Sequence, residues 1–196
     1  MQGRWSIPLV VDGRQARLDG TIRRVGRPSV VPWLAIGLAF ALLTAAFLVR
    51  RRQSLLRTAT IWLGAVAAVA TLVTAIGLAA SSTASEGTWV ESGNEIVLAL
   101  VALGFLLRGS RDSRALAGGL VGLLAVAAGA TRLPVLLHGI VLSALPGQLA
   151  RTAVVLALSA GAAAAILGVV VFFDVLEHYD EPLTGGLIDT GRSNSV

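Results

Sequence analysis

The amino-acid sequence predicts an all-α integral membrane bundle of about five transmembrane helices, with a short N-terminal extracytoplasmic β-hairpin segment. Composition is the first reason: 55% of the 196 residues are hydrophobic, 14% are charged and the mean hydropathy is +0.80. A soluble domain has about 25% charged residues. Arrangement is the second reason, because the charges gather in blocks that separate long apolar runs. Helices of a soluble core would carry charges every third or fourth residue, so the blocks indicate a multi-pass membrane protein.

The segment 1–29 precedes the first apolar run and has a different pattern. Short stretches with β-branched and alternating residues are separated by Asp12-Gly13 and Asp19-Gly20. Asp-Gly is a preferred two-residue hairpin turn because both positions need positive φ. Three short strands joined by two turns are expected, and a sheet of this size needs a surface to pack on. The alternative is an ordered tail that lies on the membrane face.

The predicted bundle, 30–176, contains five apolar spans, at 30–49, 58–80, 91–107, 115–131 and 148–176. The first, second and last are long enough to cross about 30 Å of hydrocarbon at about 1.5 Å per residue. The third and fourth are short, and the third reaches its length only when it is extended back to Glu91. Residues 133–145 are apolar but too few to span, and prolines interrupt them, so an interfacial or re-entrant segment is expected. Residues 177–196 form the predicted cytoplasmic tail.

The placement of arginine predicts the orientation. The loops after the first and third spans are rich in arginine, whereas the loop 81–93 carries Glu86 and Glu91 and no arginine. The positive-inside rule therefore places the basic loops and the carboxyl tail in the cytoplasm and the N-terminus outside the cell membrane. The segment 1–29 itself carries six arginines, which opposes its export. One hypothesis removes the conflict: Met1 is not the biological start, and an exported domain with a signal peptide precedes it.

A family resemblance bears on the same region. The stretch Trp5–Thr21, followed by Pro28 and by Pro32-Trp33 at the start of the first span, resembles the junction in certain uncharacterised actinobacterial multi-pass membrane proteins. There, an exported β-rich domain ends in a W-x-(I/V)-P-x-x-V-D-G-R-like strand pair that leads into a helical bundle. The histidine-containing stretch of that exported domain is absent here. The resemblance implies a topology and no catalytic residue, since the family has no assigned activity.

The residue types exclude several classes of function. There is no cysteine, so disulfides, thiolate metal sites and cysteine catalysis are excluded. All sixteen basic residues are arginine, which is typical of a GC-rich bacterial genome. The arginines that give the net charge of +5 sit at the ends of apolar spans, where they contact lipid headgroups, and no nucleic-acid partner is expected. Nucleophile-elbow, phosphate-loop, HExxH and nucleotide motifs are absent, so we expect neither an enzyme nor a cofactor.

Four ionisable residues define a candidate outer polar site: Glu91, Glu95, Arg132 and His138. Ionisable groups near membrane depth tend to pair or to face a cavity. In the functional interpretation, Arg132 pairs with Glu95 and His138 lines a pocket. In the alternative, these are ordinary helix ends, in which Asn94 caps a helix, Glu95 complements its positive end and Arg132 extends to the interface.

Small residues recur at four-residue spacing and predict helix packing at Gly118, Gly122, Gly161 and Gly168. Gly64 belongs to the same pattern, with Ala68 four residues later. Packing within one bundle is the favoured interpretation, and dimerisation through Gly118 and Gly122 is the alternative.

An acidic group follows the last span, and Glu177, His178 and Glu181 could share a helical face with the spacing of metal ligands. A solvated helix end explains these residues better, so they are weak candidates and no metal is expected. The functional prediction is a non-enzymatic anchor or scaffold for an exported domain or a membrane complex, with the lipid bilayer and a membrane or extracytoplasmic protein as partners. The alternative is a small-solute or copper-type metal permease that uses the outer Arg132/His138 region.

Overall fold

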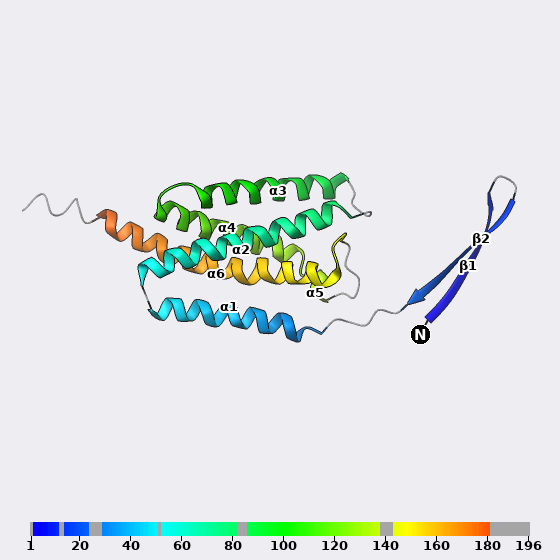
Figure 1. The fold of residues 1–196 in the computed structure, drawn as a ribbon, viewed down its shortest axis with the longest axis horizontal. Helices are drawn as coiled ribbons and strands as arrows, with labels where there is room; N and C mark the ends of the chain where they lie inside the picture. Colours follow the sequence, from blue (N-terminus) through cyan, green and yellow to red (C-terminus); the bar gives the residue numbers. More distant parts are fainter. Residues whose placement is uncertain are drawn as a thin grey trace, which may run out of the picture.

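A computed structural model describes residues 2–11, 14–23, 29–50, 52–81, 86–137 and 143–180. Its elements, in chain order, are β1 (Gln2–Val11), β2 (Arg14–Arg23), α1 (Val31–Arg50), α2 (Gln53–Ala79), α3 (Glu86–Leu107), α4 (Arg111–Thr131), α5 (Pro134–Leu137) and α6 (Gly147–Asp180). All of these helices except α5 are long and apolar enough to cross a membrane. Successive long helices run in opposite directions (Figure 1). The predicted fold class, a membrane bundle with a short strand pair, is confirmed.

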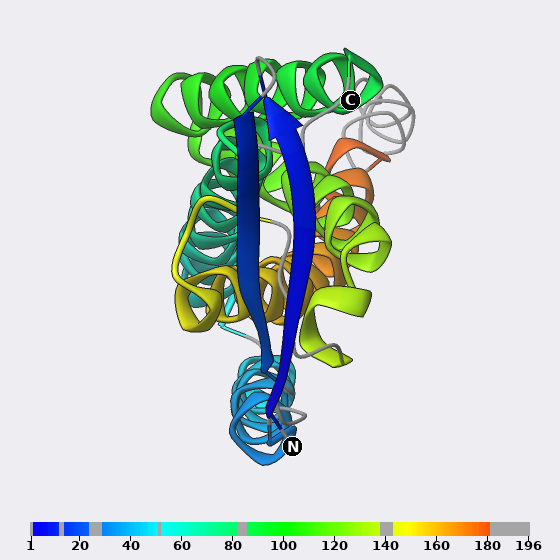
Figure 2. The same ribbon diagram turned by 90° about the vertical axis from the view of Figure 1, so that its right-hand side faces the viewer.

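The centre of the bundle is formed by α2, α4 and α6, with α3 and α1 on opposite sides (Figure 2). Leu63 of α2, Ala115 of α4 and Leu167 of α6 belong to one buried core cluster. The outer helix α1 packs mainly on α6, and along its length Thr44 alone is buried. We call the end of the bundle at which α1 begins the amino end, and the end at which α6 finishes the carboxyl end.

Most helices begin earlier than the apolar spans that predicted them. The helix α2 begins at Gln53 instead of 58, α3 at Glu86 instead of 91 and α4 at Arg111 instead of 115. Hydropathy marks the part of a helix that lies in hydrocarbon, whereas the helix itself continues into the polar interface. The start of α4 shows the cause, because the Ser110 hydroxyl accepts a hydrogen bond from the backbone N–H of Ser113 at 3.3 Å. This cap supports a first turn that is too polar to be counted as a span.

The segment between α4 and α6 does not add a crossing in its described part. The short helix α5 packs through Leu136 against Val154 and Val155 near the start of α6. Further along, the backbone N–H of Ala144 donates to the carbonyl of Gly77 in the last turn of α2 at 2.9 Å. The described residues of this segment therefore lie across the amino end of the bundle, and residues 138–142 lie outside the described part of the chain.

The hairpin corrects the expectation of three strands. Antiparallel pairing runs without interruption from Gln2 opposite Arg23 to Val11 opposite Arg14, which leaves a two-residue connection. The second Asp-Gly pair is inside β2, where Asp19 lies opposite Ser6. It is not a turn, because one hairpin connection already fixes the register of every later pair. The hairpin stands apart from the helices in Figure 1.

Candidate functional site

Two of the four predicted outer residues meet at the amino end of the bundle. Arg132 follows α4 as its C-cap, and its guanidinium forms an ion pair with Glu95 of α3. The same guanidinium donates a hydrogen bond to the hydroxyl of Thr74 in α2. The side chains of Arg132 and Glu95 are 11% and 16% exposed, so each charge depends on the other for compensation. This amino-end cluster, made of Arg132, Glu95 and Thr74, joins three helices.

The other two predicted outer residues are not part of this contact. Glu91 is exposed, one turn before Glu95 on α3. His138 lies outside the described residues. Two residues that the sequence analysis missed do belong to this region: Thr74, which the apolar context of α2 concealed, and Ser92, whose buried hydroxyl has no hydrogen-bond partner among the described residues. The serine precedes Glu95 by three residues, so helical spacing alone would have placed the two on one face.

A small cavity of about 70 Å³ adjoins Glu95 between α2, α3 and α4. Its other walls are mostly apolar and include Thr71, Ala99 and Val121. A volume of this size accommodates water molecules but not a drug-sized ligand. The site therefore contains a compensated charge pair beside a small, mostly apolar space.

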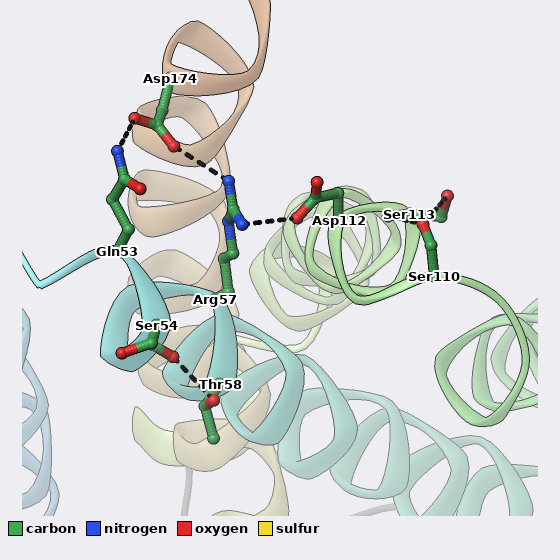
Figure 3. Close-up of polar contacts among 8 residues, drawn as sticks. All are labelled: Gln53, Ser54, Arg57, Thr58, Ser110, Asp112, Ser113 and Asp174. Carbon is green, nitrogen blue, oxygen red and sulfur yellow. Dashed lines mark hydrogen bonds and ion pairs between the residues drawn. The ribbon is translucent and has the colours of Figure 1, made fainter. Parts of the chain in front are cut away.

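A second polar cluster, which the sequence analysis did not predict, lies at the carboxyl end (Figure 3). Arg57 of α2 forms ion pairs with Asp112 of α4 at 3.0 Å and with Asp174 of α6 at 3.2 Å. The amide of Gln53 donates to the second oxygen of Asp174 at 2.5 Å. We call Gln53, Arg57, Asp112 and Asp174 the carboxyl-end cluster. Arg57 was interpreted as a loop residue because α2 was predicted to begin at 58, and its partners are distant in sequence.

The predicted packing glycines lie at close helix contacts inside the bundle. A Cβ added at Gly118 would come within 2.7 Å of the carbonyl oxygen of Thr60, and one added at Gly122 within 2.5 Å of the carbonyl oxygen of Gly161. A Cβ added at Gly168 would come within 2.5 Å of the Cα of Gly119. One side of α4 thus touches α2 and another touches α6. Both glycines of the alternative dimerisation pair are covered within the single chain.

The acidic group after the last span lies partly on α6, which continues to Asp180. Glu177 is exposed near the end of this helix. The side chain of His178 and the whole of Glu181 lie outside the described residues. Among the described residues, no group of three or more His, Cys, Asp or Glu side chains is placed to hold a metal ion.

Arg151 is a further buried charge that was not predicted. It is 8% exposed, and its Nε donates to the carbonyl oxygen of Val135 in α5 at 3.3 Å. The contact attaches α5 to the second turn of α6. It lies at the amino end, so this end contains two arginines whose side chains are largely withdrawn from water.

Comparison with known proteins finds no matching family model, no matching curated protein and no matching solved structure.

Proposed function

We propose that this multi-pass membrane protein is a non-enzymatic anchor, which holds an exported β-rich domain or a membrane complex through its amino-terminal hairpin. The observation that supports the proposal most is an uncovered apolar pair on that hairpin. Ile7 and Leu18 lie directly opposite each other across the two strands, and their side chains are 48% and 51% exposed. Contiguous exposed apolar patches mark surfaces that bind another protein or a membrane, and we propose that this pair is the centre of such a surface.

On the opposite face of the hairpin, polar side chains lie next to this pair. Arg17 donates to the hydroxyl of Ser6 at 2.5 Å and forms an ion pair with Asp19 at 3.1 Å. Successive residues of a strand point to opposite faces, so Ile7 and Leu18 share a face that these polar residues do not occupy. A two-stranded hairpin is marginally stable alone. A β-rich partner that covers Ile7 and Leu18 would supply the missing layer.

The helical bundle has the properties of a platform. Its glycine contacts bring the backbones of α2, α4 and α6 together, and polar contacts of one arginine join three helices at each end. These features favour one packed arrangement over the alternation between two states that transport requires. The hairpin is connected to this platform through α1.

The proposed orientation has the hairpin outside a cell membrane and the carboxyl tail in the cytoplasm. Arg50, Arg108 and Arg114 all belong to helix ends at the carboxyl end of the bundle, which is the pattern of a cytoplasmic face. Because the chain has no cysteine, single cysteines report sidedness without background. A membrane-impermeant maleimide should label Ser29→Cys in intact cells, whereas Ser54→Cys should react only after lysis. The reverse pattern would contradict this orientation.

Site-specific photocrosslinking in cells tests the anchoring function. A photoreactive residue at Ile7 or at Leu18 should give an adduct with one protein of defined mass, which mass spectrometry identifies. The matched control is Val10, which is 73% exposed on the other face of the same hairpin and should give little of that adduct. Equal adducts from all three positions, or adducts with lipid alone, would contradict the proposal.

The permease remains the alternative function, and the cavity beside Glu95 is the observation that favours it. Arg132 compensates the charge of Glu95, so a cation would have to displace this partner. Uptake of copper or small solutes by proteoliposomes that contain the purified chain tests this alternative. Uptake that is abolished by Glu95→Gln would support the permease over the anchor.

A further inference from the structure

A long groove separates α1 from α6 along most of the length of α1. It is open to the outside of the bundle and has a volume of about 700 Å³, and its walls include Trp33, Gly37 and Leu48 of α1 with Leu158 and Ile166 of α6. A Cβ added at Gly37 would meet no atom within 4 Å, whereas the glycines at the α4–α6 contact leave no such room. The contact between α1 and α6 is therefore looser at Gly37 than the contact between α4 and α6 is at its glycines.

The walls of this α1–α6 groove are mostly apolar, and the indole N–H of Trp33 is buried without a hydrogen-bond partner among the described residues. The two hydroxyls that line it bond to their own helices: Thr44 donates to the carbonyl of Phe40 at 2.7 Å, and Ser159 donates to that of Val155 at 2.6 Å. The groove follows α1 from Val30 to Leu48, a distance of about 27 Å at the helical rise. One leaflet of a bilayer contributes about half of a roughly 30 Å hydrocarbon core, so the groove is long enough for an acyl chain.

At the carboxyl end the groove continues into a polar pocket of about 600 Å³. Leu48 lines both spaces, and the pocket also contains Arg57, Asp174 and Glu177. Arg57 is already engaged with Asp112 and Asp174, so the pocket has an excess of negative charge at Glu177. The exposed arginines Arg50 and Arg52 belong to the connection between α1 and α2 at this same end. Acidic side chains thus line the pocket itself, and the two arginines belong to the same end of the bundle.

We propose that the α1–α6 groove and its polar pocket bind one phospholipid with an ammonium headgroup. One acyl chain lies between α1 and α6, and the ammonium group is placed beside Glu177 and Asp174. The phosphate lies near Arg50 and Arg52, where arginines commonly hold lipid phosphates at the membrane surface. Complementary charge selects the zwitterionic headgroup over an anionic one, because a headgroup without an ammonium leaves Glu177 without a partner. The bound lipid fills the space that α1 and α6 leave open and fixes α1 to the bundle.

Retained lipid measures this binding. The full chain, purified in a mild detergent with an equimolar mixture of phosphatidylethanolamine and phosphatidylglycerol, is examined by native mass spectrometry. We expect one phosphatidylethanolamine per chain and a clear preference over phosphatidylglycerol. Equal retention of the two lipids, or a broad distribution of lipid numbers, would show bulk membrane lipid only and would overturn the proposal.

A matched pair of variants on α1 tests whether the acyl chain lies in the groove. Ala41 lines the groove, whereas Ala39 is exposed on the same helix and does not line it. Ala41→Leu should lower retained phosphatidylethanolamine by roughly fivefold or more. The leucine side chain fills space that the acyl chain would occupy, so the acyl chain loses several van der Waals contacts with the groove. Ala39→Leu should leave retention unchanged. An equal effect of the two variants on retained phosphatidylethanolamine would overturn the placement of the acyl chain in the groove.

A second pair of variants tests the position of the headgroup. This pair also tests the lipid proposal if Ala41→Leu fails to fold. Glu177→Gln removes the exposed carboxylate of the pocket, and Glu91→Gln removes an exposed carboxylate at the opposite end of the bundle. Glu177→Gln should reduce the preference for phosphatidylethanolamine several-fold, and its melting temperature in detergent without added lipid should not change. Glu91→Gln should leave the preference for phosphatidylethanolamine unchanged. An unchanged preference in Glu177→Gln would overturn the headgroup assignment.

Discussion

The two ends of the bundle have the same type of polar contact, but its exposure to water differs. At each end one arginine joins three helices: Arg132 at the amino end and Arg57 at the carboxyl end. The amino-end pair is 11% and 16% exposed, whereas the side chains around Arg57 range from 21% to 44% exposed. A charge withdrawn from water is costly without its partner, whereas an exposed charge recovers its hydration when the partner is removed. The same type of contact is therefore expected to have very different energetic consequences at the two ends.

The largest expected effect is at the amino end. Glu95→Ala leaves Arg132 buried without a counter-charge and should lower the free energy of unfolding by about 3 kcal/mol. Reversible unfolding in mixed micelles measures this loss. The double variant Glu95→Leu with Arg132→Met removes both charges and should recover most of the stability, because no buried charge remains. If the losses of the single variants Glu95→Leu and Arg132→Met simply add in this double variant, the two side chains are not coupled.

The middle of the bundle, which has no charge pair, gives the second effect. Gly122→Val places a side chain where a Cβ would already come within 2.5 Å of the carbonyl oxygen of Gly161. Backbone atoms cannot yield as a flexible side chain can, so we expect a loss of about 2 kcal/mol in the free energy of unfolding. Gly104→Val is the matched control, since a Cβ there meets nothing within 4 Å. Comparable losses in both variants would show that the helix interior, and not the contact between α4 and α6, is responsible.

The comparison of the two ends also shows what the sequence can and cannot predict. The pairing of Arg132 with Glu95 was one of two interpretations of the sequence, because both are ionisable residues placed at the same side of apolar spans, and the structure shows the pair in place of the favoured ordinary helix ends. The pairing of Arg57 was not expected, because hydropathy placed the start of α2 after this residue. Once α2 begins at Gln53, Arg57 is on its second turn and can reach two neighbouring helices. An error of a few residues in a boundary thus concealed a whole cluster.

The apolar spans themselves were predictable because hydropathy and length are properties of local sequence. Which helix faces touch was not, since alanine and glycine occur on several faces of these spans. Gly118 and Gly122 were identified by their spacing, but only the structure assigns one to α2 and the other to α6. The hairpin illustrates a further limit: Asp12-Gly13 and Asp19-Gly20 are equivalent as local signals, and the register of ten residue pairs excludes the second as a turn.

At the carboxyl end the expected effect is smaller. Asp112→Asn removes one of the two partners of Arg57 from a position where the carboxylate is 44% exposed. Because Asp174 still pairs with Arg57 and the Asp112 side chain is partly exposed, we expect a loss of about 0.5 kcal/mol in the free energy of unfolding. The same measurement in mixed micelles applies. A loss as large as that of Glu95→Ala would mean that exposure does not distinguish the two clusters.

Salt provides the smallest and most selective test of the difference between the ends. The screening length falls from about 10 Å at 0.1 M salt to about 3 Å at 1 M, and exposed charges are screened far more than buried ones. The cost of Asp112→Asn should therefore shrink by a few tenths of a kcal/mol across this range, of the order of an exposed pair. The cost of Glu95→Ala should stay constant, because the penalty arises from the burial of Arg132 and not from an attraction that ions can screen. If both costs fall together, water and ions reach the amino-end cluster, and the cavity beside Glu95 is then open to the aqueous phase as the permease alternative requires.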